Sequence, residues 1–353
     1  MKKMIARLCG VLFLMPVAGY AADRGCFDMA RWDAILSDIQ TNAAAAGVND
    51  ATIRAVIKSP AFIPSIVKSD ANQAEFKLTL DQYLARTISS TRITRGVDMA
   101  GQYPTMLGRV EAKYGVPRHV ILAFWGLESN YGAVRARHKL ADAFLTLIYE
   151  GRRETFFKKQ LLSLMKTASK NNLDITQISG SWAGAMGHFQ FIPTTLEQYG
   201  VDGNGDGKID IIHSVGDAMF SAGNYLNKLG WDAHQRIVRR VELPADFDRS
   251  LLDGATKKSL SEWAAMGVRM PGGGDIPMAD MTAGLVADLN QSAILAGDVA
   301  SMATDAQSVD TDIAPRPVIV AYLTYPNFYR IKKWNSSNWY AIAVATLADA
   351  LKQ

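Results

Sequence analysis

Ile121-Leu-Ala-Phe-Trp-Gly-Leu-Glu-Ser-Asn-Tyr-Gly132 is an apolar stretch that carries one carboxylate, that of Glu128, close to its end. Pro117 suits the first position of a helix and Gly132 stands just past the expected helix end, so Glu128 falls in the last turn. The negative end of the helix dipole and the apolar neighbours both favour the neutral carboxyl, so we expect a raised pKa. A raised pKa suits a proton donor, whereas the simpler interpretation is a capping acid in an ion pair.

The first 21 residues have the pattern of a secretory signal. Three basic residues precede the apolar run Val11 to Ala18, and Gly19-Tyr20-Ala21 fits a small-x-small cleavage site. This run is too short to cross a bilayer, and no later segment has 18 uninterrupted apolar residues, so we expect no membrane span. Removal of the leader leaves 35 basic and 34 acidic side chains, and this near-neutral charge gives no indication of nucleic-acid binding.

The two cysteines indicate neither a disulfide nor a lipid anchor. Cys9 lies in the leader, which leaves Cys26 without an intramolecular partner. A lipoprotein needs small residues directly before its cysteine, but Cys26 follows Asp23-Arg24-Gly25. We therefore predict a soluble periplasmic protein that is exported by its signal peptide and is not lipid-anchored.

Periodicity divides the mature chain into three parts. Residues 22–237 repeat the spacing of amphipathic helices, and we expect a helical scaffold around Glu128 and the segment 202–217. Residues 238–314 are rich in Asp, Gly, Pro and Ser, which predicts a small mixed or β insertion, and residues 315–353 are expected to return to the helical body. After residue 236, the clearest patterns are the strand-like segments 237–244 and 317–323 and a helix with an apolar face at 339–351.

Two further segments carry polar side chains that suit a glycan. Arg152 and Arg153 stand together near an expected helix start, where positive charge opposes the helix dipole. They are either a solvated basic face or a pair of forked donors for ring oxygens or a carboxylate. The segment 181–193 combines glycines with Gln190, an amide that both donates and accepts hydrogen bonds. Such segments also mark close helix packing, and His188 within it is more typical of a satisfied turn histidine than of a catalytic one.

The segment 202–217 begins with the calcium-loop pattern Asp-x-Asn-x-Asp-Gly. Position 12, normally a bidentate Glu, is His213, and Asp217 is the candidate for the missing ligand. The expected metal ligands are Asp202, Asn204, Asp206, Lys208 through its carbonyl, Asp210 and Asp217. Crowded oxygens suit a hard cation, so we expect Ca²⁺, although a hairpin without metal has a similar composition. The scattered histidines show no zinc spacing, and no motif indicates an organic cofactor.

Two C-terminal motifs, Tyr325-Pro-Asn-Phe-Tyr-x-Ile and Trp334-Asn-x-Ser-x-x-Tyr340, complete the pattern. Together with Trp125-Gly-Leu-Glu-Ser-Asn-Tyr-Gly132, Tyr149-x-x-Arg-Arg153, Gly184-Ala-Met-Gly-x-x-Gln-Phe-x-Pro193 and the calcium loop, they resemble the lytic murein transglycosylase B family. The resemblance runs from about Phe62 to the C-terminus. It implies a mainly α fold, in which a lysozyme-like helical catalytic core carries an EF-hand-like calcium loop and a small β-containing insertion.

The same resemblance implies a lytic transglycosylase that cleaves the β-1,4 MurNAc-GlcNAc bond of peptidoglycan and leaves a 1,6-anhydro-MurNAc end. Glu128 would act first as acid and then as base, Ser129 would orient it, and calcium would be structural. The glycan groove would be lined by Tyr83, Ser129, Arg152, Arg153, Ser181, Gln190, Tyr225, Asn335 and Tyr340. The expected partners are peptidoglycan strands and complexes of cell-wall synthesis or turnover.

Two other functions remain open from the sequence. A muramidase that uses water needs a second carboxylate at a set distance from Glu128, and Asp142, Glu150 and Glu154 are candidates. The other is a calcium-dependent glycan-binding protein without catalytic activity.

Overall fold

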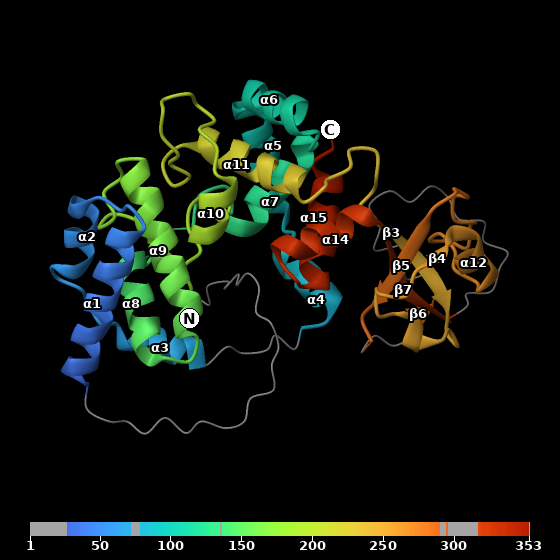
Figure 1. The fold of residues 1–353 in the computed structure, drawn as a ribbon. Helices are drawn as coiled ribbons and strands as arrows, with labels where there is room; N and C mark the ends of the chain where they lie inside the picture. Colours follow the sequence, from blue (N-terminus) through green and yellow to red (C-terminus); the bar gives the residue numbers. More distant parts are fainter. Residues whose placement is uncertain (1–26, 72–77, 135, 290–293, 296–316, 353) are drawn as a thin grey trace. The chain divides into compact units, whose positions relative to one another are not determined.

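The computed structural model describes residues 27–71, 78–134, 136–289, 294–295 and 317–352 (Figure 1). The expected signal peptide and Cys26 lie outside these residues. The chain forms two compact units, one of residues 1–76, 90–229 and 351–353 and one of residues 77–89 and 230–350. Within the described residues, no helix has both the length and the apolar character needed to cross a membrane.

The first unit is built of helices. They are α1 (Met29–Ala45), α2 (Asp50–Ile57), α3 (Pro64–Ala71), α5 (Ser90–Gln102), α6 (Pro104–Tyr114), α7 (Arg118–Ser129), α8 (Leu140–Glu150), α9 (Glu154–Lys170), α10 (Pro193–Tyr199) and α11 (Val215–Lys228). The short strands β1 (His138–Lys139) and β2 (Ser179–Gly180) pair antiparallel. The mainly α fold that the sequence predicts is therefore confirmed.

Helix α7 lies at the centre of this unit because it is apolar on all sides. Nine of its twelve residues are buried, among them Phe124 and Trp125. Helices α5, α6 and α11 pack against α7, while α8 packs against α9 in a neighbouring layer (Figure 1). A helix enclosed in this way fixes the position of a side chain at its end.

The start of α7 differs by one residue from the prediction. Pro117 is the N-cap and Arg118 is the first helical residue. The carboxylate of Glu111 accepts hydrogen bonds from the backbone N of Arg118 (3.3 Å) and from its Nε (2.9 Å). Since proline cannot supply a side-chain cap, this glutamate from the preceding helix satisfies the free N–H at the helix start.

The second unit combines a small antiparallel sheet with helices. Its elements are α4 (Leu80–Thr87), β3 (Val238–Pro244), the 3₁₀ turn η1 (Arg249–Leu251), β4 (Lys258–Ser259), α12 (Leu260–Ala265), β5 (Thr282–Ala287), β6 (Ile294–Leu295), β7 (Pro317–Thr324), α14 (Pro326–Trp334) and α15 (Asn338–Ala350). The sheet order is β3-β7-β5-β4, with β6 also paired to β7. The strands expected at 237–244 and 317–323 and the terminal helix are confirmed, whereas the boundaries 238–314 of the insertion stay a prediction.

Trp263 of α12 anchors the core of this sheet. Its indole is fully buried and its Nε1 donates a hydrogen bond to the carbonyl of Ala283 on β5 (2.8 Å). Thr324 of β7 pairs with Val238 of β3 on one edge and with Gly284 of β5 on the other, so β7 lies between these two strands. The backbone of β7 is thereby paired on both edges, and six of its eight residues are buried, which fits its continuous apolar sequence.

Candidate active site

Glu128 lies in the last turn of α7, as the sequence predicts, and its side chain is half-buried. The helix stops because Asn130 adopts left-handed backbone angles, with φ of 50°. Tyr131 and Gly132 follow with φ of 58° and 78°, so three consecutive residues have positive φ. Strained backbone of this kind is concentrated at functional sites, where surrounding contacts hold it in place.

The contacts that hold this helix end converge on Ser129, which is fully buried. Its Oγ donates to the carbonyl of His188 (2.6 Å) and accepts from the backbone N of Gly132 (2.9 Å). Ser129 therefore joins the end of α7 to the segment 181–193. Its expected role in orienting Glu128 stays a prediction.

His188 is held by the same helix end. Trp125 Nε1 donates to its Nδ1 (3.0 Å), and burial lowers the pKa of its imidazole. An indole N–H only donates, so Nδ1 is the unprotonated acceptor and the ring is neutral. The sequence did not single out this residue as functional, because nothing near it in the chain reveals its contacts with Trp125 and Ser129.

The segment 181–193 is shaped more by protein packing than by an open backbone. A Cβ on Gly187, where φ is +71°, would lie 2.5 Å from the carbonyl oxygen of Ile211. Ser181 Oγ accepts from the backbone N of Ala185 (3.0 Å), and Gln190 Nε2 donates to the carbonyl of Gly187 (2.9 Å). Close packing, the alternative that the sequence left open, accounts for this glycine, while the two polar side chains stay half-buried.

Tyr225 on α11 forms an aromatic pair in the first unit. Its ring stacks on Tyr199 with centroids 4.5 Å apart, and burial raises its pKa to about 12. The phenol therefore stays protonated at any physiological pH and can act as a hydrogen-bond donor.

Arg152 and Arg153 share one internal carboxylate, that of Asp70 on α3. Arg152 Nε donates to Asp70 Oδ2 (3.0 Å), and the Nη2 atoms of both arginines contact the same carboxylate. Asp70 is almost completely buried, and the Arg153 guanidinium also lies over the ring of Phe157 (4.8 Å). Two cations against one anion leave one positive charge at this partly exposed pair. The sequence missed Asp70 because it lies more than 80 residues away and in another helix.

The expected metal ligands divide into two groups in the structure. Asp202 accepts from the backbone N of Gly205 and Gly207 (2.6 and 2.8 Å), and the side chains of Asn204 and Asp206 accept from the N–H two residues on. A carboxylate oxygen has further lone pairs, so these loop side chains keep acceptor capacity for a cation.

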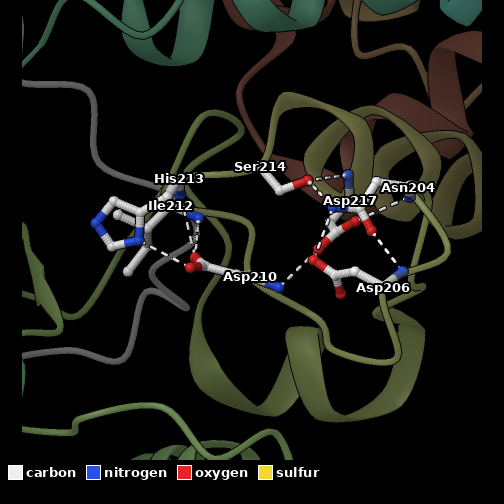
Figure 2. Close-up of polar contacts among 7 residues, drawn as sticks. All are labelled: Asn204, Asp206, Asp210, Ile212, His213, Ser214 and Asp217. Carbon is white, nitrogen blue, oxygen red and sulfur yellow. Dashed lines mark hydrogen bonds and ion pairs between the residues drawn. The ribbon is translucent and has the colours of Figure 1, made fainter.

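The second group is engaged with the protein itself. Asp217 is fully buried, and its two oxygens accept from the backbone N of Gly203 (2.9 Å), Asn204 (3.2 Å) and Asp210 (2.8 Å), as Figure 2 shows in part. Asp210 turns to His213, whose Nδ1 lies 2.8 Å from its Oδ2. Within the part of the chain that the structure describes, no three or more His, Cys, Asp and Glu side chains gather in a way that would hold a metal ion.

Of the ten expected catalytic and groove residues, seven lie in the first unit and three in the second. The first unit contains Glu128, Ser129, Arg152, Arg153, Ser181, Gln190 and Tyr225, and the second contains Tyr83, Asn335 and Tyr340. Tyr83 on α4 is half-buried, whereas Asn335 and Tyr340 are buried. Asn335 ends α14, and its Oδ1 accepts from the backbone N of Ser337 (3.0 Å). The structure thus brings Glu128 and Ser129 together at one helix end, and a groove that joins all ten residues stays a prediction.

Comparison with known proteins confirms the resemblance to lytic transglycosylases. A family model described as transglycosylase SLT domain matches residues 31–349. The membrane-bound lytic murein transglycosylase B of Escherichia coli K12 is 30% identical over 276 residues, which cover 76% of this chain and 66% of that protein. The chain therefore spans slightly less than two thirds of this relative.

Solved structures show the same fold. SltB3 from Pseudomonas aeruginosa, solved in complex with NAG-NAM-pentapeptide and with NAG-anhNAM-pentapeptide, is 35% identical, with a TM-score of 0.80 over 91% of this chain and 79% of that one. Escherichia coli Slt35 in complex with calcium is 26% identical, with a TM-score of 0.71 over 91% and 92% of the two chains. The motifs, the fold and the family model agree, and the chain belongs to the transglycosylase SLT domain family.

Proposed function

We propose that this protein is a lytic transglycosylase that cleaves the β-1,4 bond between N-acetylmuramic acid and N-acetylglucosamine in peptidoglycan. The observation that carries the proposal is the position of Glu128, a half-buried carboxylate at the end of a buried helix in a chain of this family. The solved complexes of SltB3 with a muropeptide and with its anhydro form support the choice of substrate and product.

The mechanism needs one carboxylate. Protonated Glu128 donates its proton to the departing glycosidic oxygen while positive charge builds on C1 of the muramic residue. The resulting carboxylate then removes the proton from the 6-hydroxyl of the same sugar, and that oxygen attacks C1 within the molecule. The 2-acetamido group shares the charge of the intermediate, and the product is a 1,6-anhydro-muramoyl end.

A water-using muramidase would need a second carboxylate, and the three candidates each make a contact within the protein. Asp142 accepts from the backbone N of Ala61 (3.0 Å), and Glu150 accepts from that of Arg152 (3.0 Å). Glu154 pairs with Lys158 (2.8 Å). Each candidate for a second catalytic carboxylate thus has a contact within the protein, and the products decide whether one of them also acts as a general base.

We further propose that the loop at 202–217 binds Ca²⁺ as a structural ion. Asp202, Asn204 and Asp206 have the hard oxygen donors that this cation prefers, and the carbonyl of Lys208 completes the loop set. Asp217 accepts hydrogen bonds from three backbone N–H groups of this segment. It therefore stabilises the loop conformation even where it is not itself a ligand. The calcium complex of Slt35 supports this assignment.

The remaining expected residues complete the proposal. The polar side chains of Arg152, Arg153, Ser181, Gln190 and Tyr225 would contact the glycan strand, and action on peptidoglycan would take place in the periplasm after export by residues 1–21. Cell-wall synthesis or turnover complexes are the proposed protein partners.

Product analysis tests this function. Purified protein is incubated with sacculi, the products are reduced with borohydride, and their masses are measured. We expect anhydro ends that resist reduction, and Glu128→Gln abolishes their release while Glu150→Gln and Glu154→Gln retain it. Reducible muramic ends would establish a muramidase instead, and binding to sacculi without any product would establish a non-catalytic glycan-binding protein.

A further inference from the structure

We propose that His188 is a positioning residue, which fixes the C-terminal end of α7 and thereby the carboxylate of Glu128. The catalytic part of this inference rests on the proposed function. The structural part concerns the contacts of His188 with the helix end and stands independently of the reaction.

His188 forms hydrogen bonds with α7 residues that come before and after Glu128 in the sequence. Its Nδ1 accepts from Trp125 Nε1 (3.0 Å), three residues before the glutamate. Its carbonyl accepts from Ser129 Oγ (2.6 Å), one residue after it. Residues three and four apart lie on neighbouring positions of a helix, so these two bonds enclose the turn that carries Glu128. A rotation or translation of that turn would break both bonds together.

The imidazole also fills the space above the strained turn that follows the helix. A Cβ on Gly132, where φ is +78°, would lie 2.6 Å from His188 Cε1 and 2.7 Å from its Nδ1. The ring therefore lies directly against the Gly132 backbone. Asn130 and Tyr131 have unfavourable positive φ, and such a conformation persists only when surrounding contacts determine it. Packing of the ring on this turn is one such contact.

The backbone of His188 connects the helix end to a third segment. Its N–H donates to the carbonyl of Ile211 (3.2 Å), which follows the 202–210 loop. The neighbouring Gly187 also lies against that carbonyl. The backbone N–H of His188 is thus bonded to the segment after the loop, while its ring and its carbonyl are bonded to α7. A side chain whose own backbone is held in this way is suited to positioning, because its place is determined by the fold.

The requirement on this side chain is an acceptor at the Nδ1 position. The indole of Trp125 is buried and can only donate, so loss of the acceptor leaves a buried N–H without a partner. An asparagine places its Oδ1 close to where the histidine has Nδ1, whereas leucine offers similar volume without an acceptor. The two substitutions therefore separate hydrogen bonding from packing.

The experiment compares His188→Asn and His188→Leu with the wild-type protein on sacculi. We expect His188→Leu to lower kcat by about tenfold or more, the effect of losing one buried hydrogen bond, with little change in KM. His188→Asn restores most of kcat. The matched control is His234→Leu, at an exposed histidine of the second unit, and it leaves kcat unchanged.

A double-mutant cycle with Trp125→Phe, which removes the donor, separates positioning from a general loss of stability. In that background we expect His188→Asn and His188→Leu to have the same kcat, because no indole N–H remains to be satisfied. A difference between them of the size seen in the wild-type background would overturn the proposal. So would wild-type kcat in His188→Leu, or equal losses in His188→Leu and His188→Asn.

A measurement without turnover keeps the structural part testable. The indole N–H resonance of Trp125, assigned from its loss in Trp125→Phe, is expected to be protected from hydrogen exchange in the wild type and in His188→Asn. If His188→Leu does not fold, slow exchange in His188→Asn still supports the hydrogen bond, and fast exchange in the wild type overturns it. If the wild type releases no anhydro product, the proposed function fails while this readout still decides the role of His188.

Discussion

Substitution of Asp70 by asparagine removes the charge that holds two arginines together. Asp70 has 1% of its side chain exposed, whereas Arg152 has 46% and Arg153 has 23% exposed. Without the carboxylate, two guanidinium groups share a site with no anion between them, and the new amide directs an N–H toward a donor. We therefore expect a lower free energy of unfolding for the first unit.

The size of the loss follows from the burial of the three groups. Breaking a fully buried ion pair costs roughly 3–5 kcal/mol, and breaking an exposed pair costs roughly 0–1 kcal/mol. Here the anion is buried but both cations retain part of their hydration, so we expect about 2–3 kcal/mol. The control is Asp50→Asn, since Asp50 pairs with Arg54 at 3.6 Å with both side chains largely exposed, and it should cost no more than about 0.5 kcal/mol.

Hydrogen exchange read by mass spectrometry suits this test, because a chain of two units need not unfold in a single step. Amides of α3, α8 and α9 report on the ion-paired region, and strand β5 of the second unit serves as the internal reference. The expected result is faster exchange in those helices for Asp70→Asn and unchanged exchange in β5. Equal effects of Asp70→Asn and Asp50→Asn would refute the reasoning from burial.

Three further perturbations test other parts of the molecule. Trp263→Phe should destabilise the second unit by about 2–3 kcal/mol, because it opens a cavity and leaves the carbonyl of Ala283 without its donor; exchange of β5 amides measures the loss, and unchanged exchange would contradict it. Burial raises the pKa of Glu242 above its ordinary 4.5, so the folded state loses stability as pH rises through the raised value. Glu242→Gln keeps the acceptor for the Gly272 N–H (3.2 Å) and should raise the melting temperature of the second unit at neutral pH but not below pH 4.5, whereas a gain that is equal at both pH values would contradict this cause. Chelation should lower the melting temperature without moving the pH optimum of activity, and an unchanged melting temperature would remove calcium from the loop at 202–217.

Sequence periodicity predicted the elements whose burial is continuous. The helix that carries Glu128 was recognisable because nearly every residue from Val120 to Leu127 is apolar, and the structure buries all of them. Strand β7 was recognisable for the same reason, whereas β3 was recognisable from the alternation of its side chains. Local sequence decides such elements, since the spacing of apolar side chains is a local property.

Contacts between distant residues were beyond that reasoning. Nothing in the sequence around Asp70 distinguishes it from an ordinary surface acid. Its carboxylate is buried against two arginines that lie more than 80 residues away. The arginines had been expected to be either solvated or directed at a ligand, but each donates to this internal carboxylate. A partner for paired charges can be predicted only when the packing of their helices is known.

The proposed single-carboxylate mechanism gives a reason for the many contacts at the end of α7. In that mechanism one group reaches the glycosidic oxygen as an acid and then the 6-hydroxyl as a base, so a small displacement of Glu128 would impair both steps. A reaction with two carboxylates divides these tasks between two positions. The structure places the necessary precision in the neighbours of Glu128, because Ser129 and Trp125 both bond to His188 and the turn beyond them adopts three positive φ values in succession. On the proposed function, the strained turn and the buried hydrogen bonds therefore serve one purpose, which is to leave the carboxylate of Glu128 a single position.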